Sequence, residues 1–153
     1  KGDLAAAELL YCEALEVRRE TLGNRHPSTL ISINNLVTLC LAKGDLAAAL
    51  PLLREEVEVQ RETLGIRHPD TLTSISNLGS LLMAKGDLAA AELLYREALE
   101  GMREILGSRH PTTLIVTNNL AQCAAEVKGT RATRTRTMMM RTTAAARAAA
   151  SGL

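Results

Sequence analysis

Apolar and polar residues alternate with the spacing of an amphipathic helix along most of the chain. In the first such stretch, Leu4, Ala7, Tyr11 and Ala14 recur at intervals of three and four residues, which places them on one face of a helix. Most glutamates of this stretch lie on its other faces. The same spacing predicts helices over residues 3–22, 27–42, 45–64, 69–84, 87–106 and 111–126.

Two kinds of short link separate the predicted helices. One is Lys-Gly-Asp, as at Lys43, where glycine suits the left-handed end of one helix and aspartate suits the N-cap of the next. The other is Leu-Gly followed by His-Pro, as at Leu22 and His26, where proline presets φ for a first helical turn. Links this short make successive helices antiparallel neighbours.

The whole pattern repeats every 42 residues. Lys-Gly-Asp-Leu-Ala-Ala-Ala begins at Lys1, Lys43 and Lys85, and Arg-His-Pro recurs in the same register. Because one helix pair cannot bury its apolar face alone, such repeats stack into an array. The sequence therefore predicts an all-α fold, an α-solenoid of stacked antiparallel helix pairs over residues 1–127. A half repeat, two full helix pairs and a second half repeat would form it, as expected for a piece of a longer array.

The composition restricts the core to small and aliphatic side chains. Hydrophobic residues make up 46% of the chain, but it has only two tyrosines and neither phenylalanine nor tryptophan. Alanine and leucine are strong helix formers and strand formers are few, which argues against a β-sandwich or a barrel. No apolar run reaches the ~20 residues that a membrane-spanning helix needs. Cys12, Cys40 and Cys123 stand alone, as expected for free thiols in a reducing compartment.

Four elements of the repeat together carry a family resemblance: Asn-Leu in the first helix, Lys-Gly-Asp at the turn, Ala-x-x-Leu-x-x-x-Ala-Leu in the second helix, and Leu-Gly-x-x-His-Pro at the link. Over residues 1–126 this combination resembles the 42-residue tetratricopeptide repeat of kinesin light chains. The resemblance implies a non-catalytic scaffold that binds protein or peptide ligands in extended form. It also implies kinesin heavy chain or cargo adaptors as partners, and a cytoplasmic, cytoskeleton-associated location.

The resemblance also implies a binding groove, because the first helices of successive repeats line a concave surface in this family. An asparagine recurs there once per repeat, and an amide offers both a donor and an acceptor to an extended peptide backbone. The alternative is that these asparagines only solvate an exposed helix face. The groove-facing positions map onto Asn34, Asn35, Thr38, Ser76, Asn77, Ser80, Asn118, Asn119 and Gln122.

Two residues depart from the family pattern in the middle repeat. Glu56 stands where the family has a small residue, and a carboxylate at a helix contact costs several kcal/mol unless it is paired. Val37 is larger than the small residue that the family prefers after leucine. We therefore expect looser packing in the middle of the array. Pro51 lies inside a predicted helix, where we expect a local bend.

The chain lacks the motifs of common catalytic and cofactor sites. It contains no glycine-rich phosphate loop, no H-E-x-x-H and no G-x-S-x-G. The histidines of Arg-His-Pro lie one per repeat, too far apart to place ligands about 2.0–2.1 Å from one zinc ion. We therefore predict no enzyme, no cofactor, no metal and no small-molecule substrate.

Charge divides the chain into two parts. Residues 1–127 carry 12 basic and 17 acidic residues, whereas residues 128–153 carry six basic residues and no acidic one. The second part is a disordered basic tail, a weak alanine-rich helix packed on the last repeat, or a segment without function. As a tail it would bind an anionic surface, although without aromatic residues for base stacking a nucleic acid is a poor candidate. This binder, and a generic or signalling scaffold without a motor link, are the alternatives to a motor adaptor.

Overall fold

The computed structural model describes residues 2–151, which form helices and no strand. This confirms the predicted all-α fold. The first five helices begin and end within one residue of the predicted positions. The helices are α1 (Gly2–Leu22), α2 (Pro27–Lys43), α3 (Leu46–Thr63), α4 (Pro69–Ala84), α5 (Leu88–Leu106) and α6 (Pro111–Ser151).

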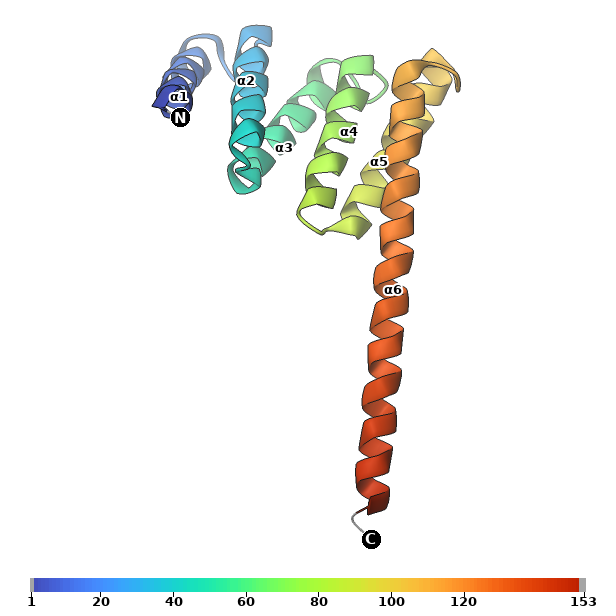
Figure 1. Cartoon of the computed structure of the whole chain (residues 1–153). Helices are drawn as coiled ribbons and strands as arrows, with labels where there is room; N and C mark the ends of the chain where they lie inside the picture. Colours follow the sequence, from blue (N-terminus) through green and yellow to red (C-terminus); the bar gives the residue numbers. More distant parts are fainter. Residues whose placement is uncertain (1, 152–153) are drawn as a thin grey trace.

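The helices stack in chain order into an α-solenoid. Each packs against the next, and α4 also reaches α6. Figure 1 shows α2, α4 and α6 following one another along the stack, with α3 and α5 between them. This confirms the predicted solenoid of antiparallel helix pairs. α4 contacts α6, whereas α2 and α4 are not in contact within the described residues. The looser packing expected around Glu56 and Val37 stays a prediction.

Both links cap the helices that follow them. Gly44 has a φ of 75° and ends α2, and the Asp45 carboxylate accepts a hydrogen bond from the Ala48 N–H at 3.0 Å. In the other link, Nδ1 of His26 accepts a hydrogen bond from the Ser28 N–H at 3.1 Å. The repeated histidine is therefore an N-cap, which its place in a linker motif did not reveal.

The core explains why Val37 is tolerated. Val37 and Leu53 occupy the positions of Gly79 and Tyr95 in the next repeat, 42 residues on. Tyr95 is fully buried, and a Cβ added to Gly79 would lie 3.1 Å from its ring. The large Tyr95 thus faces the small Gly79 in one repeat. In the preceding repeat, two residues of middle size, Leu53 and Val37, occupy the equivalent positions. α3 runs through Pro51 as one continuous helix.

Ion pairs join each repeat to the next on the side of α1, α3 and α5. Arg19 of α1 pairs with Glu55 of α3, and the equivalent pair 42 residues on, Arg61 with Glu97 at 2.8 Å, joins α3 to α5. Pairs of this exposure contribute about 0.2–1 kcal/mol each, so they help align neighbouring repeats more than they stabilise the fold. A second set links Arg25 with Glu62 and Arg67 with Glu104.

The sixth predicted helix ends in the wrong place. α6 does not end at residue 126 but continues to Ser151, and it projects away from the stack (Figure 1). Residues 128–145 are exposed, so this part of the helix does not pack on the last repeat as the helical alternative proposed. Threonine hydroxyls along it bond carbonyl groups one turn back, as from Thr133 to Gly129 at 3.0 Å. The division of the chain at residue 127 stays a prediction.

Among the described residues, no helix combines the length and the apolarity that crossing a membrane requires.

Candidate functional site

Two adjoining hollows lie between α2 and α4, with α3 beneath them. One encloses about 420 Å³ and the other about 300 Å³. Asn34 of α2, Glu56 of α3 and Asn77 of α4 line both, so the two hollows form one depression. We refer to it as the α2–α4 groove. α2 and α4 are the first helices of two neighbouring repeats, and α3 lies between them in the stack.

The structure brings four of the nine predicted site residues together in this groove: Asn34, Thr38, Asn77 and Ser80. Of the other five, Ser76 is buried, Asn119 is half-buried, and Asn35, Asn118 and Gln122 are exposed away from the groove lining. The asparagines that face one another across the groove are therefore not the ones at the same repeat position. Asn77 faces Asn34, not its repeat equivalent Asn35, because neighbouring parallel helices meet with different faces.

The side chains of the groove differ in how far they are already engaged. Thr38 Oγ1 donates a hydrogen bond to the Asn34 carbonyl at 2.9 Å. Ser80 Oγ accepts a hydrogen bond from the Tyr95 hydroxyl at 2.8 Å and donates one to the Ser76 carbonyl at 3.2 Å. The amides of Asn34 and Asn77 make no hydrogen bond to any residue between 2 and 151 that the structure places. They are the groove's open donors and acceptors.

Glu56 forms part of the floor of the groove and is only 4% exposed. Its Oε1 accepts hydrogen bonds from Ser74 Oγ at 3.2 Å and Gln60 Nε2 at 3.3 Å. Burial raises the pKa of the Glu56 carboxyl, and these two hydrogen bonds oppose the rise. The two neutral donors thus offset part of the cost of burying this carboxylate at a helix contact. No basic side chain in the described part of the chain forms an ion pair with Glu56.

The sequence reading missed Ser74 and Gln60 as members of the site. The Glu56–Gln60 contact has a simple sequence signal, since residues four apart meet on one face of a helix. Ser74 gives no such signal, because it comes from α4, 18 residues away. Only the packing of α3 against α4 shows that its hydroxyl meets the carboxylate.

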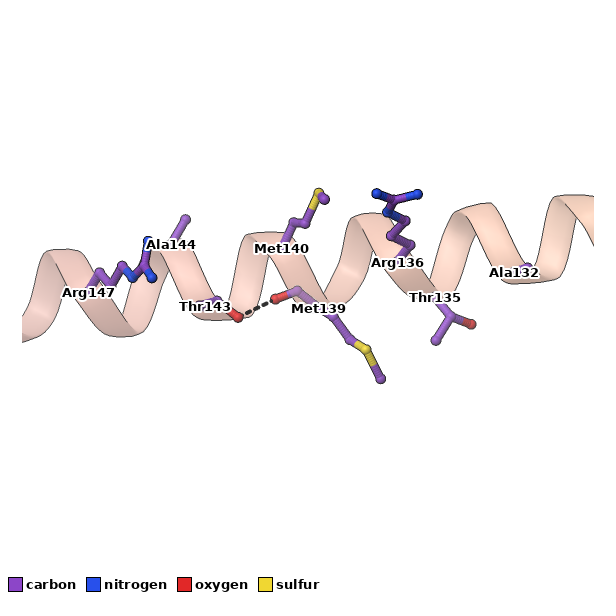
Figure 2. A pocket seen from close by; sticks show the side chains of 8 residues that line it. All are labelled: Ala132, Thr135, Arg136, Met139, Met140, Thr143, Ala144 and Arg147. Carbon is purple, nitrogen blue, oxygen red and sulfur yellow. Dashed lines mark hydrogen bonds between the residues drawn. The ribbon is translucent and has the colours of Figure 1, made fainter.

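A different kind of hollow lies along the projecting part of α6 (Figure 2). Every side chain that lines it comes from this one helix, and Figure 2 shows Arg136 and Met139 on opposite sides of the ribbon. No second element closes this surface within the described residues. It therefore lacks the walls that a ligand site needs.

Glu56 is the buried ionisable side chain of the groove, and among the described residues neither a cysteine nor a histidine lines it. Within residues 2–151, no cluster of His, Cys, Asp or Glu could hold a metal ion. Burial raises the pKa of the Cys40 and Cys123 thiols, which favours their neutral, unreactive form. The geometry supports recognition through hydrogen bonds and one carboxylate.

Comparison with known proteins agrees with the repeat architecture. The profile of the tetratricopeptide repeat family matches residues 1–62, 34–104 and 70–131. No curated protein matches the chain.

Three solved structures are similar to this chain. Two are of a Podosopora anserina protein provisionally described as a kinesin light chain with nearly identical TPR-like repeats. One of these two, a single-substitution variant, has a TM-score of 0.73 and the other 0.72; each is 30% identical and covers 80% of this chain. They are matched over 57% and 58% of their own length. The third is BtubC (BKLC) from P. vanneervenii, with a TM-score of 0.71, 22% identity and coverage of 90% of this chain and 58% of its own.

This chain therefore spans less than two thirds of the length of each of these structures. At 22% identity the similarity to BtubC shows the fold alone. Tetratricopeptide repeats indicate a scaffold that binds protein or peptide partners, and the fold is of a non-catalytic type. Because the family profile matches successive segments between residues 1 and 131, the chain belongs to the tetratricopeptide repeat family.

Proposed function

We propose that this protein is a non-catalytic scaffold that binds extended peptide segments of partner proteins in the α2–α4 groove. The observation that carries the proposal is the pair of open amides, Asn34 and Asn77, on opposite walls of one depression. An amide can donate to a peptide carbonyl and accept from a peptide N–H. Two of them can therefore hold a backbone without selecting side chains.

A motor-linked role extends this proposal. The similarity to structures described as kinesin light chains supports kinesin heavy chain or cargo adaptors as partners. The three free cysteines, Cys12, Cys40 and Cys123, support the cytoplasm as its location. The same groove chemistry serves a generic tetratricopeptide scaffold equally well, so the motor link needs its own test by co-purification with kinesin heavy chain.

A peptide array tests the groove. The full chain is screened against nine-residue peptides, and ligands are measured again with the Asn34→Ala/Asn77→Ala variant. A net hydrogen bond contributes about 1 kcal/mol, so the double variant should bind roughly tenfold or more weakly. Asn35→Ala is the matched control, because it removes the neighbouring amide of the same helix outside the groove. Equal loss of binding in the double variant and in the control would show that the groove is not the binding surface.

A further inference from the structure

We propose that the α2–α4 groove selects peptides that carry a lysine or an arginine, whose cationic group binds the Glu56 carboxylate in the floor of the groove. This inference rests on the proposed function, because it names the class of peptide that the groove accepts. It assigns a specificity-determining role to one carboxylate.

The first observation is the state of the Glu56 carboxylate. Both of its hydrogen bonds, from Ser74 and Gln60, reach the same oxygen, Oε1. The other oxygen, Oε2, accepts no hydrogen bond from the described residues. It is nevertheless not one of the fully buried side-chain atoms that lack a hydrogen-bond partner. Oε2 is therefore not fully sealed, and Glu56 lines both hollows of the groove. A charged acceptor in a side chain that is only 4% exposed is satisfied best by a charged donor.

The second observation is Gln60, whose side chain lines the same 420 Å³ hollow. Its Nε2 donates to Glu56, while its Oε1 is buried without a hydrogen-bond partner. A buried acceptor left unpaired costs about 1–3 kcal/mol. Because Gln60 Oε1 is sealed from solvent, Glu56 Oε2 is the acceptor that this part of the floor offers to a ligand, and the Gln60 amide N–H helps to hold the carboxylate in place. A lysine ammonium brings three donors and an arginine guanidinium five, and neither brings an acceptor.

The walls of the hollow suit the rest of a basic side chain. Leu30, Ile31 and Leu64 line it, and aliphatic surface of this kind covers the stem of a lysine or arginine while its charged end reaches a partner. Two other charged residues, Arg25 and Asp70, are exposed and also line this hollow. Arg25 pairs with Glu62 at 2.5 Å, so it leaves the Glu56 carboxylate free for an incoming cation.

The carboxylate is not a requirement of the fold. The residues equivalent to Glu56 in the neighbouring repeats are Ala14 and Ala98. Ala98 is fully buried in α5, which packs against both α4 and α6. A second helix of the repeat therefore packs on its neighbours without a carboxylate at this position. Glu56 thus adds a charged group to this groove at a position where the neighbouring repeats have alanine.

Peptide libraries with one fixed position test the inference. The probes are nine-residue libraries with blocked termini whose central residue is lysine, arginine, glutamine or leucine, and binding to the full chain is measured by fluorescence anisotropy. The proteins are the unchanged chain, Glu56→Gln, which keeps the shape and removes the charge, and Glu58→Gln as a control. Glu58 is an exposed glutamate on the same helix.

The unchanged chain should bind the lysine and arginine libraries about tenfold or more tightly than the glutamine library, since hydrogen bonds to charged groups are worth about 1.5–3 kcal/mol. Glu56→Gln should lose this preference and still bind the glutamine library, whereas Glu58→Gln should keep it. A preference that persists in Glu56→Gln overturns the inference and leaves the proposed function standing. Binding of no library overturns both.

Sedimentation of the same proteins tests an alternative occupant of the groove, the basic segment of a second copy of the chain. The basic part of the chain after residue 127 also carries arginines, and a second copy could supply one of them to the groove. Self-association that disappears in Glu56→Gln would assign the groove to that segment and overturn its assignment to a separate partner. Sedimentation of all three proteins as monomers supports the separate partner.

Discussion

At the scale of single residues, Glu56 links the stability of the fold to pH. Burial raises the pKa of its carboxyl above the ordinary value of 4.5, so the folded chain holds this proton more tightly than the unfolded chain does. Its contribution to stability is therefore fully present below about pH 4.5 and is lost as the pH rises through the raised folded-state pKa. Above that pKa the ionised carboxylate is a cost to the fold.

Replacing Glu56 by glutamine should therefore stabilise the protein at pH 7. The expected gain in the free energy of unfolding is on the order of 1 kcal/mol, because a neutral amide needs less solvation than a buried carboxylate. At pH 4 the gain should shrink, since the native carboxyl is then protonated. Urea unfolding at both pH values measures the difference, and exposed Glu58→Gln should show no such change. A gain of the same size at pH 4 and pH 7 would contradict the argument.

At the scale of helices, the link motifs determine where each helix begins. His68 Nδ1 accepts a hydrogen bond from the Asp70 N–H at 3.2 Å and so caps α4. His68→Ala should lower the free energy of unfolding by about 1 kcal/mol, whereas His68→Asn, a strong N-cap residue, should keep most of the stability. Urea unfolding at pH 8 compares the two variants. If the asparagine loses as much stability as the alanine, the histidine acts through packing and not as a cap.

The same links explain which helices could be predicted from the sequence. Glycine, aspartate and proline mark the ends of the first five helices, whose predicted ends lie within one residue of the observed ones. The end of α6 was predicted from the repeat period alone, without such a stop signal. Beyond residue 127 the sequence leaves the repeat but keeps alanine, methionine and arginine, which are strong helix formers. Gly129 is exposed within α6 and does not end the helix.

The candidate site was harder to predict than the helices for a geometric reason. The repeat period identifies equivalent positions, such as Asn35 and Asn77, but a groove is formed by facing positions, such as Asn34 and Asn77. Which faces meet depends on how α3 separates α2 from α4. The period also shows that Glu56 differs from the alanines at the equivalent positions, but not what it contacts. Its donor Ser74 comes from another helix, so the contact depends on how α3 packs against α4.

At the scale of the whole molecule, buried side chains from all six helices form one connected core that runs along the solenoid. Each helix packs on its chain neighbours, and stability in such an array is roughly a sum of repeat and interface terms. α4 and α5 pack against each other more extensively than any other pair of described helices, and both also contact α6. At one end, α1 leaves Leu9 and Leu10 about two-thirds exposed. At the other, residues 128–145 of α6 are exposed.

This gradient predicts how amide hydrogens exchange along the chain. Amides in α4 and α5 should exchange slowest, those in α1 faster, and those of residues 128–145 fastest, because no tertiary contact supports that part of α6. Exchange followed by mass spectrometry at neutral pH measures the order. Gly129→Pro should speed exchange beyond residue 129 and leave α4 and α5 unchanged, since proline breaks the helix where nothing packs against it. Uniform exchange from α1 to the end of α6 would instead mean that the chain unfolds as one cooperative unit, and the stacked-repeat description of its stability would be wrong.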